Sequence, residues 1–155
     1  MRDLVGNSIP MKFTRYIQLL FVVLVSVLTG CSTVEPGKRY GNIPLESLKS
    51  AYIVLAPSTD HKLAEYIHAA LEAHQVTSSM GPPDKIPADV SFFVTYEDHW
   101  RWDMAMYLNS LDVRFCDITN RQTFATGAFR QGAFHSFPNP RKKTVEVVES
   151  IYKAK

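Results

Sequence analysis

The sequence predicts an α+β domain, with four to five strands in a mostly antiparallel sheet and two helices packed on one face. Three observations carry this prediction. A continuous apolar segment at 51–56 is followed by a helical apolar pattern that begins at Leu63. Residues 89–131 then contain several segments typical of strands, and a second helical pattern follows Asn139. Each of these elements has one apolar face, and a sheet layer packed against a helix layer buries these faces most simply. Along the chain the elements follow the order β-α-(β)-β-β-β-α.

The first half of the domain, from about Leu48, contains a strand, a helix and a short strand. Residues 51–56 are apolar with β-branched members, which is typical of a strand buried on both faces. Residues 58–60 supply helix-capping side chains, and an amphipathic stripe follows at Leu63, Ile67, Ala70, Leu71 and His74. Residues 75–80 can form a short strand before a Gly-Pro-Pro break.

The second half predicts three longer strands, at 89–96, 104–118 and 123–131, with a hairpin connection at 117–122. In the middle strand the apolar residues change parity, so one face stays buried only with an extra residue near Asn109-Ser110, where we expect a β-bulge. Gly127 leaves room in the last strand for a bulky neighbour or for another bulge.

The last predicted helix begins at Asn139, a favourable N-cap, with Pro140 in the first helical position. Its apolar stripe consists of Val145, Val148, Ile151 and Tyr152.

Composition indicates one ordinary folded domain. The chain has 155 residues, of which 46% are hydrophobic and 21% are charged. After loss of the first 30 residues, 14 basic and 14 acidic residues would remain. This balance argues against a nucleic-acid-binding protein, which needs clustered positive charge.

The N-terminus has the features of a secretion signal. A basic stretch after Met11 precedes an apolar run from Leu19 to Leu28, broken only by Ser26. The run is shorter than the roughly 20 residues that cross a bilayer, so we expect it to be cleaved. Translation could begin at Met1, with a long polar leader, or at Met11.

The residues Leu28-Thr29-Gly30-Cys31 resemble the lipobox of bacterial lipoproteins. The resemblance implies that the Cys31 thiol receives a diacylglycerol, that cleavage precedes Cys31, and that the new amino terminus is acylated. Ser32 after the cysteine implies the outer membrane, with the domain facing the periplasm. The expected organisation is a signal peptide at 1–30, a flexible tether at 31–47 and one domain at 48–155. The alternative for Cys31 is an ordinary buried cysteine.

A lipidated Cys31 leaves Cys116 with no disulfide partner in the chain. Its strand-like surroundings predict a partly buried small residue, and the neighbouring sequence supplies no base that would make it a nucleophile.

Behind the lipobox, the element order over residues 48–153 resembles several periplasmic lipoprotein domains. These are the amino-terminal domain of the Tol β-propeller protein, the curli-secretion lipoprotein and the activators of penicillin-binding proteins. The segment Tyr-x-Asp-x-Trp-x-Trp-Asp at 96–103, followed by Met-x-Met-Tyr-Leu at 104–108, is similar to small uncharacterised outer-membrane lipoproteins. That similarity implies no particular activity.

The same segment is the densest candidate site, with Tyr96, Asp98, His99, Trp100, Trp102 and Asp103. Asp98, His99 and Asp103 could ligate a metal or transfer protons, with the tryptophans as walls of the site. Alternation along a strand favours another arrangement. Trp100 and Trp102 then share one face and pack in the core, whereas Glu97, His99 and Arg101 face water.

Three further sets of residues are weaker candidates. His61, Glu65 and His68 lie on one helix face and could hold zinc, although such a trio is more often a solvated face. The basic residues 141–143 could touch anionic lipid or glycan. The aromatic loop that contains Phe134, His135 and Phe137 could reach the tryptophans if the last strand runs beside the preceding one.

We therefore expect a non-catalytic, lipid-anchored periplasmic module that binds an envelope protein through these aromatic residues. The alternatives are a small metal-dependent hydrolase and a glycan or small-ligand binder that uses the same cluster. The sequence indicates no cofactor and no metal site of diagnostic spacing.

Overall fold

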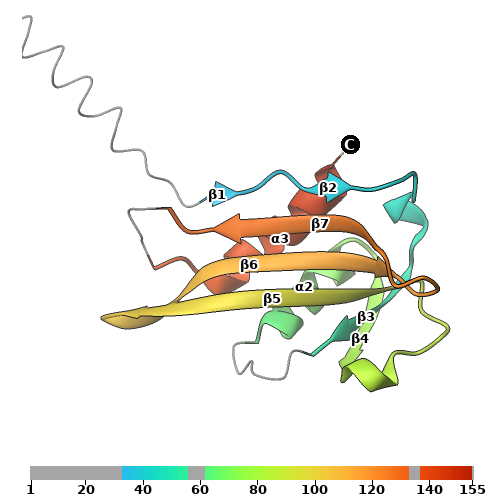
Figure 1. Ribbon diagram of the computed structural model, residues 1–155, viewed down its shortest axis with the longest axis horizontal. Helices are drawn as coiled ribbons and strands as arrows, with labels where there is room; N and C mark the ends of the chain where they lie inside the picture. The colour runs from blue at the N-terminus through green and yellow to red at the C-terminus, as the bar shows by residue number, and fades with distance from the viewer. Residues whose placement is uncertain (1–32, 56–61, 133–136, 155) are drawn as a thin grey trace, which may run out of the picture. The chain divides into compact units, whose positions relative to one another are not determined.

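The structure is a computed structural model that describes residues 33–55, 62–132 and 137–154. Within these residues, seven strands form one mixed sheet, and two helices, α2 and α3, cover one of its faces (Figure 1). The predicted α+β class is confirmed. The strand number differs from the expected four to five, because two short strands that were not expected, β1 and β2, pair with the edge of β7.

The first half follows the predicted order. Strand β3 (Ser50–Val54) runs parallel to both of its neighbours, β4 (Thr77–Gly81) and β5 (Phe92–Asp103). Both faces of β3 are buried, with Ile53 in the main core and Tyr52 in a second cluster on the other face, which explains its continuous apolar sequence. Helix α2 (Leu63–Ala73) connects β3 to β4 and buries Leu63, Ile67, Ala70 and Leu71 of the predicted stripe, whereas His74 is its half-buried C-cap. The expected capping residues 58–60 lie outside the described residues.

Strands β5, β6 (Ala105–Asp117) and β7 (Thr123–Arg130) form an antiparallel meander. The predicted bulge is confirmed: His99 pairs with Ser110 and Trp100 with Leu108, which leaves Asn109 as the extra residue. Strand β5 is longer than the predicted 89–96, because its polar continuation pairs with the beginning of β6 in a long hairpin.

Helix α3 (Pro140–Lys153) begins as predicted, since the Asn139 side chain accepts a hydrogen bond from the Lys142 amide at 3.1 Å. The helix packs on β7 at Gly127. A Cβ atom there would lie 2.8 Å from the Val147 carbonyl oxygen and 2.8 Å from Ile151 Cγ1. The predicted bulky neighbour of Gly127 is therefore this helix.

Residues 33–47 differ from the flexible tether that the sequence suggests. Strands β1 (Thr33–Val34) and β2 (Lys38–Arg39) pair with β7, and Leu45, in the short helix η1 (Leu45–Ser47), is buried in the core. Arg39 binds the C-terminal end of α3, donating to the Ile151 and Tyr152 carbonyls at 3.3 and 2.6 Å. Residues 33–47 therefore pack as part of the compact unit.

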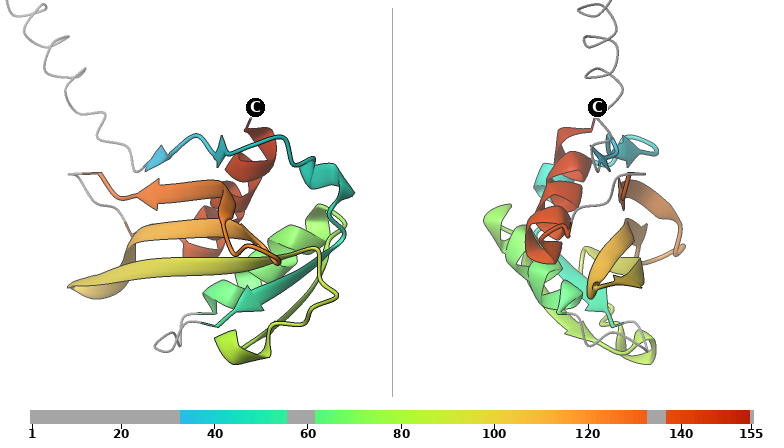
Figure 2. Two further views of the ribbon diagram at one scale, coloured as in Figure 1. Left: turned by 45° about the vertical axis from the view of Figure 1, so that its right-hand side comes forward. Right: turned by 90° about the vertical axis from the view of Figure 1, so that its left-hand side faces the viewer.

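The two faces of the sheet differ. The main core lies between the sheet and the helices and contains Phe92, Leu111, Phe115 and Phe129. The opposite face is not covered by either helix (Figure 2) and holds a small second cluster of Tyr52, Phe93 and Cys116. Cys116 is buried there, and its sulfur lies 3.6 Å from Thr123 Oγ1, so it is a packing residue.

Candidate functional site

The 96–103 cluster lies along the second half of β5, where alternation sends successive side chains to opposite faces. Tyr96 is buried in the main core, and Trp100 packs against that core while its Nε1 donates to Asp98 Oδ2 at 2.6 Å. Trp102 is 71% exposed, although it shares the face of Trp100. The expectation that both tryptophans are core residues thus holds for Trp100 alone, because the hairpin continues past the main core.

The three residues of the possible metal or acid-base site do not converge. Asp98 lies on the helix-covered side of β5, whereas His99 and Asp103 lie on the other side. His99 is exposed, as predicted. No group of three or more metal-ligating side chains occurs within residues 33–55, 62–132 and 137–154.

The end of the β5–β6 hairpin carries an exposed apolar group. Trp102 pairs across the hairpin with Met106, and Met104 forms the turn between Asp103 and Ala105. Met104 is 89% exposed and Met106 is 52% exposed. We call Trp102, Met104 and Met106 the hairpin tip; Figure 1 shows β5 and β6 continuing past the end of the other strands to reach it.

The aromatic loop before α3 reaches the same hairpin at one point. The ring of Phe137, itself 56% exposed, meets the buried ring of Tyr107 edge to face at 5.8 Å. Tyr107 belongs to β6, next to Met106. Phe134 and His135 lie outside the described residues. The aromatic residues therefore divide into a buried set around Tyr96 and Trp100 and an exposed set around Trp102 and Phe137.

The weaker candidates have structural partners. His68 contacts Ser78 Oγ through Nδ1 at 2.6 Å, and its Nε2 lies 3.4 Å from Glu72. Glu65 is exposed, and His61 lies outside the described residues. In the basic run, Lys143 pairs with Glu146 at 2.8 Å and lies over the Phe129 ring, 5.5 Å from its centroid.

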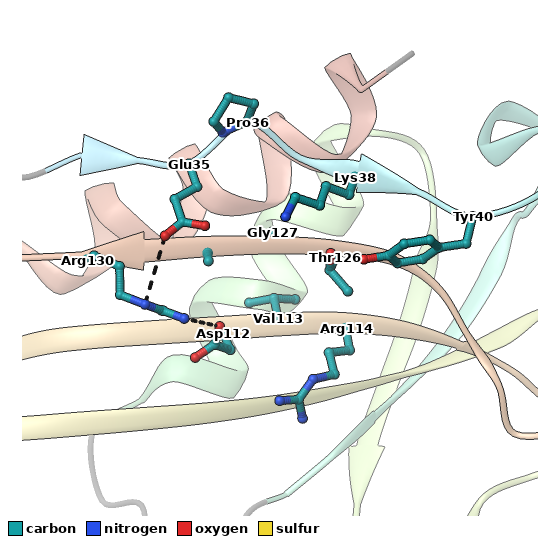
Figure 3. Close-up of a pocket in the computed structure, with 11 residues that line it drawn as sticks. Glu35, Pro36, Lys38, Tyr40, Asp112, Val113, Arg114, Thr126, Gly127 and Arg130 are labelled. Atoms are coloured by element: carbon teal, nitrogen blue, oxygen red, sulfur yellow. Dashed lines mark hydrogen bonds and ion pairs between the residues drawn. The ribbon is translucent and has the colours of Figure 1, made fainter.

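The structure also shows a pocket of about 230 Å³ that the sequence did not predict (Figure 3). It lies on the open face of the sheet, where the segment around β1 and β2 passes beside β7. Its charged and aromatic lining residues come from segments far apart in the chain. They are Glu35, Lys38, Tyr40, Asp112, Arg114 and Arg130.

Ion pairs order the charged side chains of this pocket. Arg130 donates from Nη2 to Asp112 at 2.6 Å, with Glu35 4.0 Å from its Nε, and Arg114 forms a two-bond pair with Glu97 at 2.8 and 3.1 Å. The hydrogen bonds that Arg114 donates lower the pKa of Glu97. The carboxylates of Glu97 and Asp112, which accept hydrogen bonds from the arginines, raise the pKa values of Arg114 and Arg130. Glu97 therefore remains ionised at neutral pH, which suits recognition better than proton transfer.

The pocket was missed for a physical reason. Its i, i+2 residues on β6 and β7 are visible in the sequence: Asp112 with Arg114 on β6, and Ala128 with Arg130 on β7. Their pairing depends on the register between the two strands, and the remaining wall depends on where residues 35–40 lie. The low hydrophobicity of that segment gave no sign that it packs on the sheet.

No family model and no curated protein matches the chain. Among solved structures, it is similar to a PelC dodecamer from Paraburkholderia phytofirmans, with 13% identity and a TM-score of 0.55. That match covers 81% of this chain and 99% of the PelC chain. A PelC variant from the same organism matches with 13% identity and a TM-score of 0.56, over 79% of this chain and 99% of that one.

A weaker overlap is found with TolB from Acinetobacter baumannii, at 14% identity and a TM-score of 0.47, over 79% of this chain and 31% of that one. At these identities the comparisons show a shared fold with PelC and nothing about activity. Among the described helices, none is long and apolar enough to cross a membrane. The chain is thus an α+β domain with the fold of PelC.

Proposed function

We propose that the chain is a lipid-anchored, non-catalytic binding module of the bacterial cell envelope. It is attached to the outer membrane through Cys31 and presents the open face of its sheet to an envelope protein. The observation that carries the binding role is the polar pocket on that face, formed by β6, β7 and the segment around β1 and β2.

The pocket suits a polar or mixed-charge segment of a partner protein. It offers three cationic side chains, Lys38, Arg114 and Arg130, and two acidic ones, Glu35 and Asp112. Paired charges of both signs favour selection of a complementary partner over tight non-specific binding. Because the arginines are already held in place by acids, a partner would meet preorganised donors.

The anchor is proposed from the lipobox-like residues that end at Cys31, two positions before β1. Mass spectrometry of the purified native protein tests it. A mature form that begins at Cys31 and carries diacylglycerol and an acyl chain would support the anchor. An unmodified Cys31, or a retained leader, would contradict it, and Cys31→Ser provides the reference mass.

The binding face is tested by photo-crosslinking in cells that express the full chain. A photoreactive residue in place of the exposed Lys38 should give one discrete adduct that mass spectrometry identifies. The same residue in place of Glu65, on the exposed side of α2, is the matched control. The adduct from position 38 should weaken when Arg114→Glu reverses a pocket charge. Equal adducts from both positions would contradict the proposed face.

Separate experiments test two other functions, a ligand binder and a metal-dependent hydrolase. A glycan or small-ligand binder is favoured by the exposed ring of Tyr40 beside the polar pocket, and ligand-dependent NMR shifts at Thr126 would indicate it. A metal-dependent hydrolase would require bound metal in the purified protein. Adducts between two copies would indicate that this chain assembles, as the PelC structures do.

A further inference from the structure

The hairpin tip projects from the same end of the sheet as the start of β1. Strand pairing places Thr33 opposite Arg130, Arg130 opposite Ser110, and Ser110 opposite His99, in one row across the sheet. Strand β1 begins at this row, so the covalent chain back to Cys31 also starts there. The hairpin continues past the row in the same direction, through four further residue pairs, from Trp100–Leu108 to Asp103–Ala105.

The hairpin projects further past this row than the chain to Cys31 can. Met104 lies five positions beyond His99, which corresponds to about 16 Å at 3.3 Å per residue. Cys31 lies two positions before Thr33 and can be at most about 7 Å from it. Across the sheet, β1 lies two inter-strand spacings from β6 and three from β5, or about 10–14 Å. A lipid on Cys31 would therefore hold the hairpin tip at the surface of the same membrane.

We propose that the hairpin tip is a second membrane contact, with Trp102, Met104 and Met106 inserted among the lipid headgroups of the membrane that holds Cys31. This inference rests on the proposed lipidation of Cys31. With the sheet end facing the bilayer, the tip would reach at least about 9 Å deeper than Cys31, within the 5–10 Å depth of interfacial segments when residues 31–33 are extended.

The chemistry of the tip fits a membrane interface. Tryptophan is enriched at headgroup depth, because its ring is apolar and its N–H is polar, and methionine adapts to irregular apolar surroundings. The ladder between β5 and β6 continues to the turn, so the two strands bond each other to the end. Beyond the row, the Asn109 carbonyl accepts from the Gln131 amide at 2.9 Å, and past this bond neither outer edge of the hairpin pairs with another described strand. Such edges need water, which limits insertion to the interface.

The small area of the tip argues against a protein partner at this place. A specific protein–protein interface buries about 800 Å² on each side, whereas three side chains at the end of a two-stranded hairpin offer much less.

The backbone of Met104 adds a separate observation. Its φ of 57° lies in the left-handed region that asparagine and glycine favour, and an apolar side chain still occupies it.

Fluorescence quenching tests the proposal with the full mature lipoprotein in vesicles of phosphatidylethanolamine and phosphatidylglycerol. Half of the samples contain phospholipids brominated on the acyl chains, which quench nearby tryptophan. The chain has two tryptophans, and Trp102→Phe leaves Trp100 as the reference emitter. We expect brominated lipid to remove most of the emission that is due to Trp102 and little of the emission from Trp100.

Two variants sharpen the test. Met104→Asn keeps a residue that tolerates the left-handed backbone, so it should preserve the melting temperature while Trp102 becomes less quenched. Tyr40→Trp in the Trp102→Phe background places an exposed reporter near Phe124, six positions from Arg130 along β7. That reporter lies about 20 Å away from the row on the side opposite to the tip and should stay unquenched.

The possible results separate the hairpin contact from the Cys31 anchor. Equal Trp102 emission in ordinary and brominated vesicles, from protein whose mass includes the lipid on Cys31, would overturn the hairpin contact and leave the anchor intact. An unlipidated mass would overturn the anchor. Brominated vesicles added to the unlipidated protein would then test the hairpin contact alone, and unquenched Trp102 emission would overturn that contact as well. A photoreactive residue at position 104 that links two copies, with Trp102 unquenched, would assign the tip to self-association instead.

Discussion

Replacing Gly37 by alanine tests whether residues 33–47 belong to the folded domain. Gly37 lies between β1 and β2, against the last turns of α3. A Cβ atom at this position would overlap the Ser150 carbonyl oxygen and lie 2.7 Å from the Ile151 amide nitrogen. Both are backbone atoms of a helix, so no side-chain rotation can relieve the overlap.

The expected cost follows from this contact. Overpacking a close contact costs about 1–3 kcal/mol, and the lower chain entropy of alanine returns less than about 1 kcal/mol. If the segment detached instead, Arg39 would lose its two hydrogen bonds to carbonyls at the end of α3. Hydrogen bonds from a charged group contribute about 1.5–3 kcal/mol each, so detachment of the segment would also destabilise the protein. We expect Gly37→Ala to destabilise the protein by about 1–3 kcal/mol.

Thermal unfolding followed by circular dichroism measures this effect. For a domain of this size, about 1 kcal/mol corresponds to roughly 4 °C, so the melting temperature should fall by about 4–12 °C. Lys38→Ala, at the exposed neighbouring position, is the control and should change stability by less than about 0.5 kcal/mol. A Gly37→Ala protein that melts like the wild type would refute the packing of this segment and restore the flexible tether.

Three other predictions concern individual interactions. Asn139→Ala should destabilise the protein by about 1 kcal/mol in urea denaturation, because the Lys142 amide loses its capping acceptor; Asn139→Asp should retain most of the stability. Arg114→Gln should raise the pKa of Glu97 toward its ordinary value, as NMR titration would show. Because the folded pKa of Glu97 is lowered, the stability that its pair contributes is present above the unfolded pKa of about 4.3 and is lost as the pH falls through the folded pKa. Burial raises the pKa of Tyr152 to about 12, so one tyrosine should titrate late in a spectrophotometric pH titration, and its contribution to stability should be lost as the pH rises from about 10 through 12. Tyr152→Phe should remove this late step without loss of stability, because the buried hydroxyl has no hydrogen-bond partner in the described part of the chain; persistence of the step would contradict the assignment.

Features that depend on neighbouring residues were predictable. The parity change in 104–118 predicted the bulge that leaves Asn109 without a partner in β5, and the Asn139-Pro140 pair predicted the start of α3. Alternation also predicted that Trp100 turns inward and His99 outward. These predictions succeed because strand periodicity and helix capping are local properties of the chain.

The candidate site was less predictable. Trp102 has the same parity as Trp100, and the sequence contains no sign of where the core ends along β5. That limit is set by how far α2, α3 and the other strands extend beside the hairpin. The pocket around Arg130 likewise needs β6, β7 and residues 35–40 in register, which no single segment specifies.

By itself, the sequence determined the α+β class, the order of the main elements from β3 to α3, and the lipobox-like residues at Cys31. The tertiary structure decided that residues 33–47 join the sheet, that Trp102 is exposed beyond the core, and that the start of β1 and the hairpin tip project from one end. The reason is physical. Periodicity along a segment selects a helix or a strand, whereas burial and alignment depend on contacts between residues distant in the chain, such as Gly37 with Ser150 and Thr33 with Arg130.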